Sequence, residues 1–277
     1  EGTNRLGRTR KARWLPTWNI SGAWNAHSED FFEKQHLLSH LTLKGSYSLV
    51  GVAPSWVTNS RAIIYSRAAW RPSAGQSENR NYIGSFENED LTYEKKHELN
   101  FGVDMGLLKN RLNIAADIYW RNNFDLIGAA YTIGGTRWGN VASMKSHGFE
   151  LSVSTKNIQS KDFSWTTDFI FGSTFNKVTE LDTKRNMFNF LTGNGFARQG
   201  YPVRSLFSIP FTGLDDEGFP TFMVNGKEVT RRNYRDINFQ QVDDLDFLKY
   251  EGSSEPTYNG SFGNIFTFKN FKLNVFI

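Results

Sequence analysis

The chain has 277 residues, no cysteine, and 32 Lys and Arg against 28 Asp and Glu, which gives a formal net charge of +4. The lack of cysteine excludes disulfides, thiolate metal sites and cysteine nucleophiles. No run of about 18 apolar residues is present, which excludes a transmembrane helix. The basic residues are scattered except at residues 8–13 (RTRKAR), and that cluster favours a solvated rim over a nucleic-acid surface.

Strict alternation of apolar and polar residues begins near the start of the chain and predicts β-strands with two unlike faces. The first predicted strand lies near residues 14–26 and the second at residues 41–49. Between them, residues 28–35 could form one turn of helix. A long stretch at residues 50–96, rich in Ser, Asn, Arg and Pro, follows and includes a short strand-like piece at residues 62–70.

Two hairpins occupy the middle of the chain. In the first, strands at residues 98–107 and 112–121 flank a tight turn at Lys109 and Asn110. We expect the next segment, residues 123–143, to be a loop, because it carries several glycines.

The second hairpin pairs residues 149–155 with residues 163–175 through a turn near residues 157–160. The longest insertion comes next, at residues 180–256. A final hairpin, residues 258–268 and 271–277, turns at Lys269 and Asn270.

Short and long connections therefore alternate along the chain, and this pattern is typical of an all-β transmembrane antiparallel barrel with long extracellular loops. Such barrels have short turns in the periplasm and long loops outside. The predicted periplasmic connections are residues 27–40, 108–110, 157–161 and 269–270. The predicted extracellular loops are residues 50–96, 123–143 and 180–256.

The direction of the strands predicts an incomplete barrel. The first strand would run from the outside to the periplasm, and the last would stop after seven residues, whereas a spanning strand needs about 9–11. Eight strands in an open arc would leave two bare edges in lipid, which is untenable. We expect the chain to be cut at both ends, with the rest of the barrel formed by further sequence.

Several segments, in order, resemble the barrel of SusC/RagA-type TonB-dependent transporters of Bacteroidetes. They cover nearly the whole chain and read EGTNRLGRTRKARWLPTWNISGAWN, LTLKGSYSLVG, LTYEKKHELNFGVDMGLLKNRLNIAADIYWRNNFDLI, NVASMKSHGFELSVSTKNI, FSWTTDFIFGSTFNKV, GYPVRSLFSIPFTGLDDEGFPTF and PTYNGSFGNIFTFKNFKLNVFI. The resemblance implies a multi-pass outer-membrane barrel of about 22 strands, plugged by an N-terminal domain. Residues 1–277 would then be part of the barrel domain, without the plug, the first strands or the last strands.

The resemblance also implies a function and partners. The family imports oligosaccharides or oligopeptides into the periplasm with energy delivered through the TonB complex, and a SusD-like surface lipoprotein covers the barrel mouth. The TonB complex would act through the missing N-terminal part. Lipid and lipopolysaccharide would surround the barrel, and no nucleic-acid partner is expected. A non-transporting barrel that serves as an adhesion or scaffold subunit is the alternative, and a plug and TonB box upstream would distinguish the two.

No catalytic or cofactor motif is present, so we expect no enzyme, no cofactor and no metal site. His36 and His40 have a spacing that can hold a metal on a helix, but their segment enters a strand and lacks a third ligand. Two acidic clusters lack the calcium-loop pattern and read as acidic turns of a loop. They comprise Asp215, Asp216, Glu217, Asp243, Asp244 and Asp246. A β-rich enzyme remains a third hypothesis, to be tested by hydrolysis of glycans or peptides.

Aromatic residues divide into two groups by position. Those on or beside strands favour the membrane interface, and they are Trp14, Trp18, Trp24, Trp120 and Trp165. Those in predicted extracellular segments are candidate ligand contacts, and they are Trp56, Trp70, Tyr131, Trp138, Phe188, Phe190, Phe196 and Tyr201. Residues of the second group could equally fill small cores within the loops or face the lid lipoprotein.

Overall fold

The structure is a computed structural model of the whole chain. It describes residues 2, 5–7, 9–32, 37–57, 59, 62–71, 76–132, 135–183 and 185–277. It describes the backbone alone at residues 62–71, 76–85, 131–132, 135–136 and 236.

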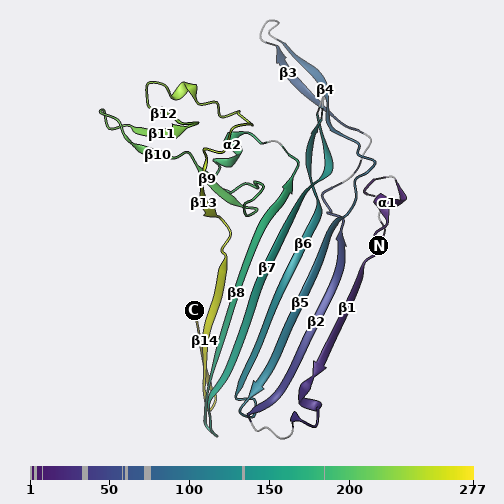
Figure 1. Cartoon of the computed structure of the whole chain (residues 1–277), viewed down its shortest axis with the longest axis vertical. Coiled ribbons are helices and arrows are strands. Elements are labelled where there is room, and N and C mark those ends of the chain that lie inside the picture. Colours follow the sequence, from purple (N-terminus) through teal and green to yellow (C-terminus); the bar gives the residue numbers. More distant parts are fainter. Residues whose placement is uncertain are drawn as a thin grey trace.

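Eight long strands lie side by side and form one antiparallel arc (Figure 1). The strand order is β1-β2-β5-β6-β7-β8-β14-β15, so neighbours in space are mostly neighbours in sequence. The arc is open, because β1 and β15 lie at its two edges. The bounds are β1 Trp18–Asn25, β2 Leu38–Val52, β5 Glu94–Leu107, β6 Leu112–Thr132, β7 Gly135–Gln159, β8 Phe163–Leu181, β14 Tyr258–Phe268 and β15 Phe271–Phe276.

The register gives this sheet one apolar and one polar face. On the apolar face, Phe101, Ile118 and Phe149 are consecutive cross-strand partners. On the polar face, Lys44 of β2 forms an ion pair with Asp104 of β5, with Nζ and Oδ2 2.8 Å apart. The apolar face is open to its surroundings: Ile20 is 71% exposed and Phe101 is 51% exposed. Alternation with a period of two therefore gives the sheet one face suited to apolar surroundings and one face suited to water.

The predicted loop at residues 123–143 is wrong, because β6 and β7 continue through it. β6 extends to Thr132, β7 begins at Gly135, and these two residues are paired. The register shifts between Asn123 and Leu126, and Asp125 adopts a φ of 56°. A β-bulge of this kind inserts extra residues and breaks the alternation, which hid the continuing strands in the sequence.

A hairpin of β3 (Ala62–Arg71) and β4 (Gln76–Phe86) projects beyond the end of the arc where β6 leads into β7 (Figure 1). This end is called the loop end of the sheet. The strand predicted at residues 62–70 is confirmed. The partner strand β4 was missed, because its first half is almost entirely polar (QSENRN). Its last residue, Phe86, pairs in parallel with Arg137 of β7.

The insertion predicted at residues 180–256 is confirmed as a set of short elements beside the loop end of the sheet (Figure 1). β9 pairs with β13, and β10, β11 and β12 form a three-stranded sheet. The bounds are α2 Met187–Phe190, β9 Ser205–Ser208, β10 Phe211–Leu214, β11 Pro220–Val224, β12 Lys227–Val229, η3 Tyr234–Asp236 and β13 Lys249–Ser253.

Short turns close the opposite end of the sheet at residues 108–111, 160–162 and 269–270. The first and third lie where they were predicted, whereas the second lies later than the predicted turn near residues 157–160, because β7 continues to Gln159. The basic cluster forms α1 (Arg10–Arg13), whose first turn is capped by the Thr9 hydroxyl. A short 3-10 turn, η1 (Ala26–Ser28), follows β1. Residues 33–36, which hold part of the helical turn expected at residues 28–35 and also His36, lie outside the described residues. No helix in the described part of the chain has the length and apolar character to cross a membrane.

Candidate functional site

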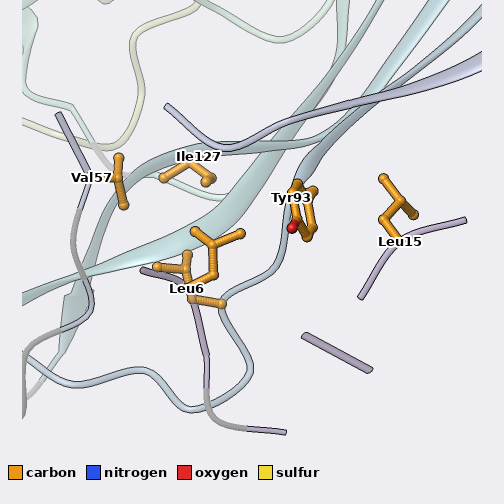
Figure 2. Packing of buried hydrophobic residues seen from close by; sticks show 6 residues of the cluster. Leu6, Leu15, Val57, Tyr93 and Ile127 are labelled. Carbon is orange, nitrogen blue, oxygen red and sulfur yellow. The ribbon is translucent and has the colours of Figure 1, made fainter. Parts of the chain in front are cut away.

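A small apolar core binds the segments at the loop end of the sheet to one another (Figure 2). It joins the N-terminal segment, the residues after β2, the residues before β5 and the extension of β6. Leu91, Val57 and Tyr93 are 0–1% exposed. The full set is Leu6, Leu15, Val57, Leu91, Tyr93 and Ile127. Burial of six such side chains away from water fixes these loops against the sheet.

Asparagine side chains complete the attachment. Asn140 of β7 donates to the Thr92 carbonyl oxygen at 2.9 Å and accepts from the Thr92 backbone amide at 3.0 Å. Asn88 donates to the Trp138 carbonyl oxygen at 3.0 Å. Tyr93 donates its hydroxyl to the Arg13 carbonyl oxygen at 3.1 Å. Hydrogen bonds that satisfy loop backbone groups hold the loops in one conformation.

Trp56 and Trp138 form an aromatic pair beside this core. Their ring centroids are 5.0 Å apart in an edge-to-face arrangement. Trp138 packs against the core, while Trp56 is 59% exposed. The prediction that both contact ligand stays a prediction, and only Trp56 offers a mainly open ring.

Two polar hollows lie next to these loops and share Asp125 and Asn140. The larger is about 470 Å³ and is lined by both cationic and anionic side chains, among them Lys11, Asp90 and Arg137. The smaller is about 330 Å³ and includes Glu180 and Asp182. The mixed charges of the larger hollow suit a ligand that carries polar groups of both signs or many hydroxyl groups, whereas the charged residues that line the smaller hollow are all acidic.

The second loop core lies within the insertion. Met187, Phe190 and Phe207 are at most 7% exposed, and Phe196 and Tyr201 pack against them. Phe190 lies 5.6 Å from Phe207 and 6.1 Å from Phe196, measured between ring centroids. Three of the candidate ligand contacts thus help to build this core. Phe188, by contrast, is 56% exposed.

Two further candidate ligand contacts lie in strands of the loop end. The backbone of Trp70 belongs to β3 and that of Tyr131 to β6. Their side chains lie outside the described part of the structure, so their ligand contact stays a prediction.

The tryptophans expected at a membrane interface lie on or beside strands. Trp18 and Trp24 come from β1, Trp120 from β6 and Trp165 from β8, and Trp14 precedes β1. Trp14, Trp18, Trp24 and Trp120 are between 39% and 63% exposed. Trp165 stacks on Phe266 of β14 at 5.7 Å and donates its indole N–H to Asn264. Their contact with a lipid interface stays a prediction.

Charged side chains on the polar face were not predicted as functional residues. Glu98 forms an ion pair with Lys96 at 2.5 Å and accepts a hydrogen bond from the Arg121 guanidinium at 3.3 Å, next to the loop end of the sheet. The same alternation that predicted the strands also places these positions on the polar face, so that signal was present in the sequence.

Among the described residues, no group of three His, Asp or Glu side chains lies close enough together to hold a metal ion. His40 instead bonds to the Asn110 side chain at 3.0 Å. Asp215 accepts from the backbone amides of Glu217 and Phe219, as an acidic turn residue does.

The fold and its faces define a class of protein: an open segment of a transmembrane antiparallel β-barrel. The family model of TonB dependent receptor-like β-barrels matches residues 2–272. The chain therefore belongs to this family, whose members are outer-membrane proteins.

Curated relatives carry the same description. TonB-dependent receptor P3 of Formosa agariphila is 24% identical over 291 residues, covering 100% of this chain and 29% of that protein. TonB-dependent receptor SusC of Bacteroides thetaiotaomicron is 25% identical over 189 residues, covering 65% of this chain and 18% of that protein.

Solved structures show the same fold. The RagAB peptide importer in its closed-closed state matches with a TM-score of 0.77 and 23% identity, covering 99% of this chain and 30% of that chain. The RagAB peptide transporter matches with a TM-score of 0.74 and 24% identity, covering 98% and 30%. The predicted likeness to SusC/RagA-type transporters is confirmed. The chain spans about three tenths or less of the length of these relatives.

Proposed function

We propose that this chain is part of an outer-membrane TonB-dependent importer that moves oligosaccharides or oligopeptides into the periplasm. The observation that carries the proposal is the open arc of eight strands with one apolar and one polar face. The apolar face would contact lipid and the polar face would line the barrel interior. Further strands beside β1 and β15 would close the barrel, because unpaired strand edges are not stable in lipid.

The dimensions of the apolar face support a membrane span. Phe175 and Trp165 of β8 lie on this face and are ten residues apart, which is about 33 Å along a strand. A strand tilt of about 40° reduces this distance to about 25 Å, the height of the apolar band of such barrels. The aromatic residues at its two ends would form the interfacial girdles.

A SusD-like lipoprotein is the proposed partner at the loop end. Large apolar side chains of the insertion are open to solvent there: Phe211 is 62%, Leu214 is 66% and Tyr234 is 55% exposed. Exposed apolar groups of this kind mark surfaces that another protein covers. Glycan or peptide would bind between this lid and the barrel, beside Trp56 and the two polar hollows.

Uptake by cells tests the proposal. A strain that lacks the full-length gene should lose growth on, or uptake of, a specific oligosaccharide or oligopeptide fraction, and loss of TonB should abolish the same uptake. Restoring the gene with W56A should weaken binding of that ligand by about tenfold, in line with an aromatic contact worth about 1.5 kcal/mol. L108A, at a similarly exposed apolar position (54%) in a short turn at the opposite end of the sheet, is the matched control.

Unchanged uptake in the deletion strain, together with loss of cell adhesion, would instead support the non-transporting barrel. Release of cleaved glycan or peptide by the purified full-length protein would support an enzyme.

A further inference from the structure

The apolar face becomes basic next to the loop end of the sheet. Lys145 of β7 and Lys177 of β8 are direct cross-strand partners, one step beyond the pair His147 and Phe175 on the same face. His97 of β5 lies on this face as well, two positions from Leu99. A strip of basic side chains therefore borders the apolar band, on the side where the loops emerge.

In the described part of the chain, neither Lys145 nor Lys177 has a carboxylate partner. Among the described residues, no carboxylate oxygen lies within 4 Å of either amine. Two nearby carboxylates are occupied, since Asp125 is paired with Lys95 at 2.5 Å and Glu180 accepts from Ser143 at 2.9 Å. Like charges that face each other across a strand pair are destabilising, so this arrangement favours an external anion.

Stacked aromatic and imidazole rings lie next to the lysines on the same face of the sheet. His97 stacks between Tyr47 at 5.6 Å and Phe124 at 5.5 Å, and His147 stacks on Phe175 at 5.4 Å. A hollow of about 380 Å³ opens here, lined by both histidines, Lys145, Tyr47, Leu99 and Trp120. Leu99 and Trp120 of this lining are followed on the same face by Phe101 and Ile118, which are exposed.

We propose that this hollow binds the phosphate-bearing headgroup of a membrane lipid. Lys145 of its lining and Lys177, which lies beside it as the cross-strand partner of Lys145, would supply two cations for the phosphate. The ring N–H groups of the histidines would donate hydrogen bonds, and the apolar rows below would contact the acyl chains. The charge and the depth both match, because a phosphate at the membrane surface is anionic and sits directly above the apolar band. The inference rests on the proposed membrane-spanning barrel.

Lipid retention by the full-length protein tests the site. The protein is placed in nanodiscs of phosphatidylcholine with a minor fraction of phosphatidic acid, and native mass spectrometry counts the lipids that stay bound after release. Wild type should retain phosphatidic acid in preference to phosphatidylcholine. K145Q/K177Q should weaken this retention about thirtyfold, since each surface cation contributes about 1 kcal/mol toward an anionic lipid.

K109Q/K161Q, two exposed lysines on the short turns at the opposite end, is the matched control and should behave as wild type. Equal retention by K145Q/K177Q and wild type overturns the site. Competition by inorganic phosphate as strong as that by phosphatidic acid overturns a lipid as the occupant. Failure of every variant to enter pure phosphatidylcholine nanodiscs would instead overturn the membrane-spanning barrel, together with the lipid site that depends on it.

Discussion

Phe188 and Phe190 lie two positions apart in α2 and have opposite environments. Phe190 is 6% exposed and sits in the core of the insertion, whereas Phe188 is 56% exposed. Both are identical residue types in the same short sequence, so only the direction of each side chain separates a core role from a possible ligand contact. The pair gives a sharp test of which aromatics of the loops are structural.

We expect F190A to destabilise the insertion by about 3–5 kcal/mol, because it leaves a cavity between Phe196 and Phe207. F188A should change its stability by about 0.5 kcal/mol or less. Hydrogen exchange over residues 185–250 of the full-length protein measures both. Equal loss of protection in the two variants would contradict the assigned core.

Glu251 of β13 is a second residue that is affected by its neighbours, which lower the pKa of its carboxyl group. A hydrogen bond from the Ser208 hydroxyl, at 2.6 Å, holds the pKa of this carboxyl below its ordinary value, and hydrogen bonding from Lys249 adds to the effect. A carboxyl with a lowered pKa in the folded state stabilises that state above its unfolded pKa. The contribution is lost as the pH falls through the lowered pKa.

We therefore expect the pairing of β9 with β13 to loosen as the pH falls below the ordinary range of a glutamate. Hydrogen exchange of the amides in both strands, corrected for the intrinsic effect of pH, measures this loosening. E251Q should remove the pH-dependent step. S208A should move the step toward the ordinary carboxyl range, and an unmoved step would show that the Ser208 hydrogen bond is not its main cause.

At the scale of elements, the long strands depend on small residues where side chains crowd the polar face. Gly148 of β7 lies against Tyr119 of β6, whose hydroxyl bonds to Thr174 of β8 at 2.8 Å. A Cβ at position 148 would overlap the Tyr119 hydroxyl and the Ser173 carbonyl oxygen. Three neighbouring strands therefore meet at one glycine.

We expect G148A to destabilise the strand set β6-β7-β8 by about 1–3 kcal/mol through overpacking. G22A in β1 is the control, because a Cβ there meets nothing within 4 Å. The measurement is the folded fraction of the full-length protein after refolding into detergent, read by the shift of the unheated band in gel electrophoresis. A normal folded fraction for G148A would show that Tyr119 moves aside at no cost.

For the molecule as a whole, the main determinant of stability is that the arc of strands is open. β1 and β15 each have one unpaired edge, and the apolar face carries exposed rings along its length. Neither feature is compatible with a stable separate molecule in water or in lipid. The family relatives extend well beyond the matched segment, which leaves room for the strands that would pair with these edges.

We accordingly expect residues 1–277, produced alone, to give no folded, heat-modifiable monomer in detergent. The full-length protein, handled in the same way, should give one. A folded monomer of the 277-residue chain would show that β1 and β15 can pair with each other or are otherwise protected.

The strands whose two faces differ could be predicted from the amino-acid pattern alone. Residues 258–268 were predicted as a strand and form β14, because aromatic residues recur at even positions (Tyr258, Phe262, Phe266 and Phe268) and a tight turn at Lys269 and Asn270 follows. The order and antiparallel pairing follow from the same pattern, since short turns force neighbours in sequence to be neighbours in space. The family resemblance could also be read from the chain alone.

Other features depend on contacts in the folded protein and could not be predicted from local sequence patterns. The bulge at Asn123–Leu126 shifts the alternation, so only pairing with β7 reveals that β6 continues to Thr132. The polar strand β4 exists because β3 pairs with it. The roles of Phe188 and Phe190, and the meeting of Lys145 with Lys177, depend on contacts between residues distant in sequence. A period of two fixes which face a residue lies on, whereas its neighbours on that face are set by register, and register is a property of the assembled sheet.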